Sequence, residues 1–216
     1  MHITVTITSD FICPWCFIGE RRLEKAITTL PPEVQIDLQW RPFELNHDMP
    51  VEGMDRMVYR SAKFGSWERS QAMDSEVAAV GKVNGIEFAY DRITRTPNTF
   101  AAHRLMWLAG EAGNPTLLAD KLFTAYFIDA LDLSDPEVLK RIGADAGLPA
   151  ARVAAVIDDG EGAKQVRQLE AEAHRLGIRG VPLLRIGHVV ISGARNSAVL
   201  AAALRAAAAV EPLAAE

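Results

Sequence analysis

Cys13 and Cys16 are the only cysteines among the 216 residues, and they lie in the run Cys13-Pro14-Trp15-Cys16. Two thiols at this spacing can exchange a disulfide, since one attacks as a thiolate and the other resolves the mixed disulfide. Such a pair can also form half of a zinc site, but no second cysteine pair or His-x₃₋₅-His run completes four ligands. The spacing therefore favours redox exchange, and we expect no metal.

The residues around the pair predict the beginning of a helix. Pro14 suits the first helical position, which makes Cys13 the N-cap residue, facing the free backbone N–H groups of Trp15 and Cys16. These donors and the helix dipole would stabilise a thiolate on Cys13. Two ordinary buried cysteines would have no reason to occupy a strand-to-helix turn. We therefore expect Cys13 to attack and the more enclosed Cys16 to resolve.

A β-α-β unit is predicted to position this pair. Apolar and polar residues alternate from Ile3 to Ile7 and again from Val34 to Trp40, with the period of two of a β-strand. Between them, the segment from Trp15 to Leu30 carries apolar residues at helical spacing, with charged residues on its other side.

A β-β-α unit is predicted near the other end of the chain. Leu183–Ile186 and Val189–Ile191 are short apolar runs separated by two residues, which is typical of a hairpin. The Ala- and Leu-rich segment Ser197–Val210 predicts a helix, and a further helix is expected from about Gly162 to Leu176, before the hairpin.

The middle of the chain, from about Asn46 to Asp159, lacks strand signals and is predicted to be all-helical. The run Ser134-Asp135-Pro136-Glu137 fits a capping box, and helices are expected at about Asn98–Gly110 and Pro149–Ile157. We therefore predict an α/β fold in which residues 1–45 and 160–216 form one discontinuous domain. Residues 46–159 would form a helical insertion domain.

Composition excludes several classes of protein. Hydrophobic residues make up 49% and charged residues 24%, which is typical of a globular domain rather than a disordered or disulfide-stapled one. The net charge of −5 comes without a basic, aromatic-rich cluster, so no nucleic-acid partner is expected. Neither a signal peptide nor an apolar run of about 20 residues is evident, so we expect no membrane association and a cytoplasmic location.

Five separated motifs resemble the DsbA-like thioredoxin family, particularly its cytoplasmic, bacterial FrnE-like branch. They are Ser9-Asp10-Phe11-Ile12-Cys13-Pro14-Trp15-Cys16-Phe17-Ile18-Gly19, Trp40-Arg41-Pro42-Phe43-Glu44-Leu45-Asn46, Pro97-Asn98-Thr99 with Ala102-His103, Gly180-Val181-Pro182 and Ile191-Ser192-Gly193-Ala194. The resemblance spans nearly the whole chain. It implies a thioredoxin fold with a helical insertion and a thiol–disulfide oxidoreductase that uses Cys13 and Cys16.

The resemblance also implies roles for residues around the pair. Val181 and Pro182 would form the cis-proline loop, whose backbone pairs with an extended substrate peptide. Pro14 and Trp15 would support the active site between the thiols. Asp10 would assist proton movement to Cys16, although a local cap or turn is an equal alternative.

Residues of the helical block are implied to face the same site. Asn98, Thr99 and His103 would contact substrate, with local pairing or solvation as the alternative for His103. No bound cofactor is expected, with glutathione as a candidate co-substrate. The partners would be protein thiols and disulfides or small thiols, and the chain would be a monomer or a homodimer.

Two other functions stay open. 2-Hydroxychromene-2-carboxylate isomerases and kappa-class glutathione transferases share this superfamily and bind glutathione, but generally have serine at the attacking position. The Cys13–Cys16 pair argues against them. A chaperone-like protein that holds clients on its helical block would retain its activity when both cysteines are replaced.

Overall fold

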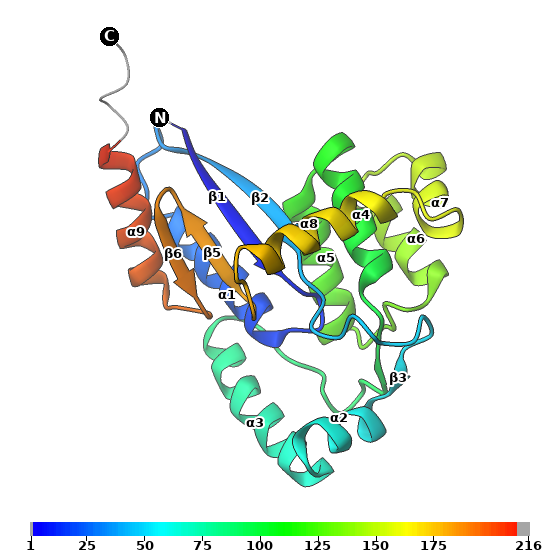
Figure 1. Ribbon diagram of the computed structural model, residues 1–216. Helices are drawn as coiled ribbons and strands as arrows, with labels where there is room; N and C mark the ends of the chain where they lie inside the picture. Colours follow the sequence, from blue (N-terminus) through cyan, green and yellow to red (C-terminus); the bar gives the residue numbers. More distant parts are fainter. Residues whose placement is uncertain (1, 211–216) are drawn as a thin grey trace.

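A four-stranded mixed sheet with strand order β2-β1-β5-β6 forms the frame of the molecule (Figure 1). The structure is a computed structural model, and it describes residues 2–210. Strands β1 and β2 are parallel, whereas β5 pairs antiparallel with both β1 and β6. The bounds are His2–Ser9 for β1, Gln35–Pro42 for β2, Leu183–Ile186 for β5 and Val189–Ser192 for β6.

Helices cover both faces of this sheet. Helix α1 (Pro14–Ile27) and helix α9 (Ser197–Val210) pack side by side, and their apolar residues form one core with those of β1, β5 and β6. Helix α8 (Ala163–Arg175) contributes Ala173 to a smaller cluster that also contacts Leu183 of β5. Adjacent strand residues point to opposite faces, so Leu184 joins the first core and Leu183 the second. This is the predicted thioredoxin fold.

The remaining helices lie between the two halves of the sheet in sequence. Helices α2 (Arg56–Phe64) and α3 (Trp67–Val83) form the lower lobe in Figure 1, next to the N-terminal end of α1. The larger group on the right contains α4 (Phe100–Ala112), α5 (Pro115–Phe127), α6 (Pro136–Asp145) and α7 (Ala150–Asp158).

Two details of the middle segment correct the sequence prediction. It is not all-helical, because β3 (Met54–Asp55) pairs antiparallel with β4 (Arg95–Thr96). Strands of two residues are too short to leave a periodic signal. The cap of α6 is also shifted by one residue. The Asp135 carboxylate accepts the hydrogen bond from the Glu137 backbone at 2.8 Å, while Ser134 Oγ accepts from the Asn98 N–H at 2.9 Å.

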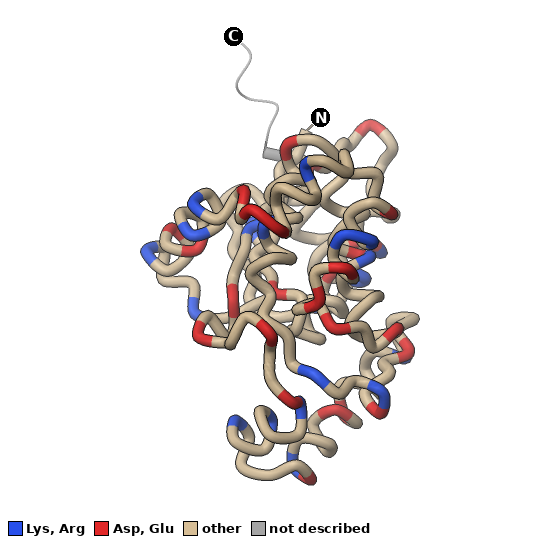
Figure 2. The backbone as a smooth tube through the Cα atoms, turned by 90° about the vertical axis from the view of Figure 1, so that its right-hand side faces the viewer, with Lys and Arg blue, Asp and Glu red and all other residues tan. Residues whose placement is uncertain are grey.

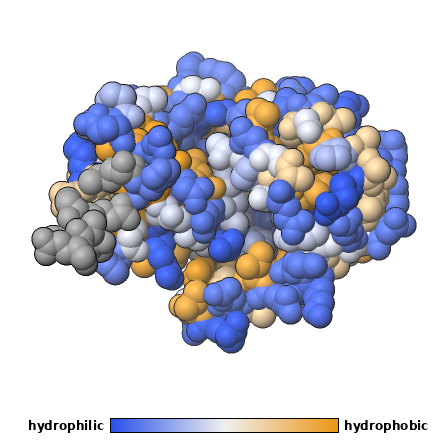
Figure 3. Space-filling model, turned by 90° about the horizontal axis from the view of Figure 1, so that it is seen from above, coloured by the Kyte–Doolittle hydropathy of each residue, from blue (hydrophilic) through white to orange (hydrophobic). Residues whose placement is uncertain are grey.

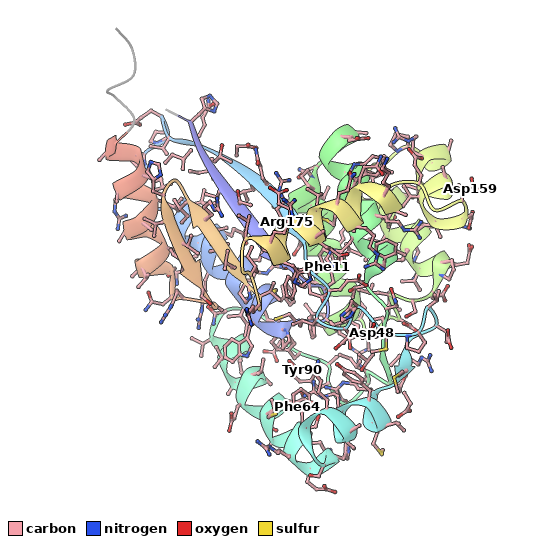
Figure 4. The ribbon with its side chains drawn as sticks, in the orientation of Figure 1. Phe11, Asp48, Phe64, Tyr90, Asp159 and Arg175 are labelled. Carbon is pink, nitrogen blue, oxygen red and sulfur yellow. The ribbon has the colours of Figure 1, made fainter. Side chains whose placement is uncertain are left out.

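Stacked phenylalanines fasten α1 to the helical block. The rings of Phe17 and Phe123 are nearly parallel, with centroids 5.2 Å apart, and Phe11 lies 5.1 Å from Phe123. All three side chains are fully buried, and each contributes roughly 1.5–3 kcal/mol by leaving water. Figure 4 shows Phe11 at the centre of the molecule, where the sheet meets the helices. The N-terminal end of α1 is therefore packed between the sheet and the helical block.

Basic and acidic residues are scattered among each other along the backbone (Figure 2), and hydrophilic residues cover most of the face seen from above (Figure 3). Within residues 2–210, no helix has the length and hydrophobicity needed to cross a membrane. The same residues hold no group of three or more His, Cys, Asp or Glu side chains arranged to bind a metal ion.

Candidate active site

Cys13 is the N-cap residue of α1. Its backbone is extended, with φ −93° and ψ 109°, and Pro14 takes the first helical position. The Cys13 N–H donates to the carbonyl oxygen of Asp10 at 3.0 Å, and the Cys13 carbonyl accepts from the Cys16 N–H at 3.0 Å. The short turn after β1 thus places the Cys13 sulfur at the positive end of the helix dipole.

The two cysteines are free thiols in different surroundings. Cys13 is 5% exposed and lines a cavity, whereas Cys16 is 3% exposed and does not line it. Burial raises the pKa of Cys16 well above its usual value, and the adjacent Cys13 sulfur raises it further. The nearby Ser9 side chain and Asp10 backbone act in the opposite direction, with smaller effect. Cys16 therefore needs help to lose its proton.

The loop before β5 closes over Cys13. The Val181–Pro182 peptide bond is cis, and the Cys13 thiol donates to the Val181 carbonyl oxygen with an Sγ···O distance of 3.7 Å. The Pro182 carbonyl in turn accepts from the Gly193 N–H at 2.9 Å. A Cβ atom on Gly19 would lie 3.3 Å from Pro182 Cγ, so a glycine in α1 allows this loop to approach the helix closely.

The cavity at Cys13 has a volume of about 270 Å³ and lies between the N-terminal end of α1 and helices α2 and α3. Pro14 and Trp15 also line it, and the Trp15 side chain is 40% exposed at its edge. Figure 4 shows Phe64 and Tyr90, two further lining residues, in the lower lobe of the molecule. The cavity is therefore lined in part by aromatic side chains, and it lies beside Cys13 and the exposed Trp15.

Positive charge exceeds negative charge in this cavity. Its charged lining residues are Arg56, Arg60, Lys63 and Asp74. The two arginines share the single carboxylate, with N···O distances of 2.6 Å for Arg56 and 2.8 Å for Arg60. Among the described residues, the partners of Lys63 are neutral, since its ammonium donates to Asn46 Oδ1 at 2.8 Å and to the Tyr59 hydroxyl. An anionic group entering the cavity would find uncompensated cations.

Asp10 lies behind the cysteines and is completely buried. One carboxylate oxygen accepts from the Leu45 N–H at 2.7 Å, and the other lies 3.5 Å from His103 Nε2. His103 is only 3% exposed, with its ring 5.2 Å from that of Phe11. Asp10 and His103 therefore form a buried pair, and the backbone of Asp10 belongs to the turn that leads to Cys13.

The other residues predicted to contact substrate lie elsewhere. Asn98, Thr99 and His103 do not line the cavity at Cys13. The Asn98 side chain donates to the Met49 carbonyl at 2.7 Å, and Thr99 is the N-cap residue of α4. Their contact with substrate stays a prediction.

Sequence reasoning missed Gly19 as a contact of the cis-proline loop, and it missed the cations of α2. Gly19 falls inside a recognised motif, but its partner Pro182 is far away in sequence. Arg60 and Lys63 stand in a charged helical segment like many others, so no local pattern marks them.

The strand order, the cis peptide before β5 and the N-cap cysteine define a thioredoxin-fold protein with a Cys-x-x-Cys pair. The chain belongs to the DSBA-like thioredoxin domain family, whose model matches residues 4–205. A probable DsbA oxidoreductase from Streptomyces coelicolor is 33% identical, with a TM-score of 0.88 over 100% of this chain and 94% of the other.

More distant proteins resemble the chain in sequence or in fold. The uncharacterized protein YwbO of Bacillus subtilis is 25% identical over 94% of this chain and 96% of its own. The cytosolic disulfide reductase DsbM of Pseudomonas aeruginosa is 18% identical, with a TM-score of 0.61 over 96% and 97% of the two chains. A 2-hydroxychromene-2-carboxylate isomerase is 12% identical, with a TM-score of 0.72 over 94% and 95%.

Proposed function

We propose that this protein is a thiol–disulfide oxidoreductase that exchanges disulfides through Cys13 and Cys16. The observation that carries the proposal is the position of Cys13. It caps α1, borders an open cavity and contacts the loop at Pro182, whereas Cys16 is enclosed behind it. An attacking thiol needs access and a site that stabilises its anion, and a resolving thiol needs only to reach the attacking one.

The exchange would proceed in two displacements. The Cys13 thiolate attacks a substrate disulfide, forms a mixed disulfide and releases one substrate sulfur as a thiolate. Cys16 then loses its proton and attacks the Cys13 sulfur, which forms the Cys13–Cys16 disulfide and releases the second substrate thiolate. The reverse sequence transfers the disulfide to a reduced substrate. In this proposal the Asp10 carboxyl group assists the proton transfer at Cys16.

The cavity suggests which partners reach Cys13. Its aromatic lining and its excess cations would accept a small anionic thiol or disulfide, and glutathione has these properties. The cytosolic disulfide reductase DsbM from Pseudomonas aeruginosa has a solved structure with GSH. Protein substrates would instead pair with the backbone of the Val181–Pro182 loop. We propose both kinds of partner, a cytoplasmic location and a FrnE-like role, with no bound cofactor.

The first test is the redox equilibrium of Cys13 and Cys16 in glutathione buffers, measured by thiol alkylation, together with insulin reduction. We expect a reversible disulfide and measurable turnover, with a potential between roughly −270 and −120 mV, the thioredoxin and DsbA values. Serine at both positions should abolish turnover. A pair that never forms a disulfide would contradict the proposal and favour a glutathione-dependent isomerase or transferase. Suppression of client aggregation that survives the double replacement would favour a chaperone-like protein.

A further inference from the structure

A second cavity, of about 210 Å³, lies at the carboxyl ends of the two parallel strands. Ser9, the last residue of β1, and Pro42, the last residue of β2, both line it and are paired in the sheet. Helices α4 and α8 supply further walls, and both pack against β2 (Figure 1). None of its lining residues also lines the cavity at Cys13. The carboxyl ends of parallel strands are a usual place for a ligand, so this second cavity is a candidate binding site.

One face of α4 shapes this cavity. His103, Met106, Trp107, Gly110 and Glu111 line it, and their spacing places them on the same side of the helix. Gly110 has no side chain, and apart from the helix's own backbone a Cβ there would meet no atom of the described residues within 4 Å. The glycine therefore leaves room on the face of the helix that borders the cavity.

The size and the apolar lining of the second cavity suit one aromatic ring. Phe11, Trp40 and Trp107 line it together with the thioether of Met106, and both kinds of group interact favourably with aromatic rings. An apolar cavity of about 150 Å³ holds benzene, whereas drug-sized ligands occupy roughly 300–1,000 Å³. At about 210 Å³, the second cavity has room for a single ring with a small substituent.

Two polar side chains in the lining lack partners. Ser9 is 2% exposed and His103 is 3% exposed, and neither Ser9 Oγ nor His103 Nε2 has a hydrogen-bond partner within residues 2–210. Buried polar atoms without a partner are rare, because leaving them unpaired costs free energy. A hydroxyl group both donates and accepts hydrogen bonds. One hydroxyl on a bound ring could therefore pair with Ser9 and with His103.

The charges around the second cavity favour a neutral ligand. Its lining includes Arg41 and Glu111, which are exposed and of opposite sign. The buried carboxylate of Asp10 lies 3.5 Å from His103 Nε2 and disfavours an anion at this nitrogen. Asp10 does not itself line the cavity, so it offers a bound cation no direct partner. Burying an unpaired charge is costly, and a neutral hydroxyl avoids this cost.

We propose that the second cavity binds a small neutral phenol. The ring lies against the side chains of Trp40 and Trp107, and the hydroxyl group hydrogen-bonds to Ser9 and His103. Binding is non-covalent and does not require the two cysteines. The site therefore gives the protein a ligand in addition to the thiols and disulfides that reach Cys13.

The test measures binding of four one-ring probes to the full-length protein by ¹⁹F NMR titration. The probes are 4-fluorophenol, 4-fluorotoluene without the hydroxyl, anionic 4-fluorobenzoate and cationic 4-fluorobenzylamine. We expect 4-fluorophenol to bind with a dissociation constant of about 1 mM or lower, within the range open to so small a ligand. 4-Fluorotoluene should bind about three- to tenfold more weakly, since it lacks the hydrogen bonds. The two charged probes should bind at least about tenfold more weakly.

Three variants locate the bound probe. Ser9→Ala should weaken binding of 4-fluorophenol about three- to tenfold but change that of 4-fluorotoluene less than about twofold. Gly110→Leu places a side chain in the cavity and should weaken both probes at least about tenfold, because the ring and the leucine compete for the same space. Ala112→Leu is the matched control, since Ala112 is exposed on the same helix and does not line the cavity. The Ala112 variant should bind both probes as wild type does.

Three results would overturn the proposal: no binding of 4-fluorophenol, equal binding of all four probes, or unchanged binding of 4-fluorophenol to the Gly110→Leu protein. If Gly110→Leu does not fold, as judged by its melting curve, the selectivity of Ser9→Ala for the phenol decides the question. Equal weakening of both probes by Ser9→Ala would then count against the site. The readout is binding alone, so a failure of the proposed thiol exchange would leave this test intact.

Discussion

The sulfur of Cys13 and the carbonyl oxygen of Val181 lie 3.7 Å apart, although 168 positions separate the two residues in the chain. The helix that begins after Cys13 orients the thiol, and the loop before β5 limits the directions from which a partner can reach it. The active site therefore belongs to both halves of the sheet, and changes in either half should affect the exchange.

Replacing one cysteine at a time should separate the two thiol roles. Cys16→Ser should accumulate mixed disulfides on Cys13, because the attacking thiol remains and the resolving thiol is lost. Cys13→Ser should form no adducts and lose exchange completely. Mass spectrometry of protein incubated with oxidised glutathione measures the adducts, and adducts on Cys16 of the Cys13→Ser protein would reverse the assignment.

Gly19→Ala should slow exchange by severalfold while leaving the protein folded. The added Cβ would lie 3.3 Å from Pro182 Cγ and would push the loop outward by a few tenths of an ångström. Alanine also favours the helix by roughly 0.5–1 kcal/mol, which offsets part of the strain. Insulin reduction measures the rate, and thermal unfolding measures the stability.

Gly110→Ala is the matched control for this substitution. Gly110 lies inside α4, and apart from the helix's own backbone a Cβ there would meet no atom of the described residues within 4 Å. We expect a stabilisation of roughly 0.5–1 kcal/mol with an unchanged exchange rate. Equal rates for the Gly19 and Gly110 variants would show that the approach of Pro182 does not matter.

Lys63→Gln should weaken the use of anionic disulfides selectively. Within residues 2–210 the ammonium of Lys63 has neutral partners only, so its charge is available to a carboxylate. We expect KM for oxidised glutathione to rise about three- to tenfold, the effect of losing roughly 1 kcal/mol of charge-assisted hydrogen bonding. Turnover of the neutral bis(2-hydroxyethyl) disulfide should not change. Lys25→Gln, in the last turn of α1, is the control for a general loss of charge. If Lys63→Gln affected both disulfides equally, a role of Lys63 in anion binding would be contradicted.

Stability should fall between about pH 5 and pH 8, partly because of Glu20. Burial raises the pKa of Glu20 to about 8, so the folded protein holds a proton that the unfolded chain releases near its usual value of 4.5. The folded state binds more protons in this range, so the free energy of unfolding decreases as pH rises through it.

The substitution Glu20→Gln should remove the part of this dependence that is due to Glu20. The variant should melt a few degrees higher than wild type at pH 8.5, since each kcal/mol is worth roughly 2–4 °C in a chain of this size. The two proteins should differ little near pH 4.5. Glu24→Gln, at a side chain that is 66% exposed, should not raise the melting temperature in this way. If Glu20→Gln raised the melting temperature equally at both ends of the pH range, charge would not be the cause.

Sequence periodicity predicted most of the sheet and its helices, because each buried face leaves a repeating pattern. The sequence also predicted Cys13 as the N-cap residue of α1, because Pro14 suits the first helical position. The two-residue strands β3 and β4 were missed because such short elements carry no repeat. The pairing of Asp10 with His103 could not be predicted, because it depends on how α4 packs against the turn after β1. Distances between distant segments are properties of packing, and no local pattern encodes them.

The order of the strands also bears on how the protein is made. Strand β5 completes the pairing of β1, yet the ribosome adds it after nearly all of the helical segment. At roughly 5–20 residues per second, the 168 positions between Cys13 and Val181 take roughly 10–30 s to synthesise. During that interval the nascent chain carries both thiols without the loop that later contacts Cys13. The cysteines are thus among the first residues made, and their active site is among the last structures to form.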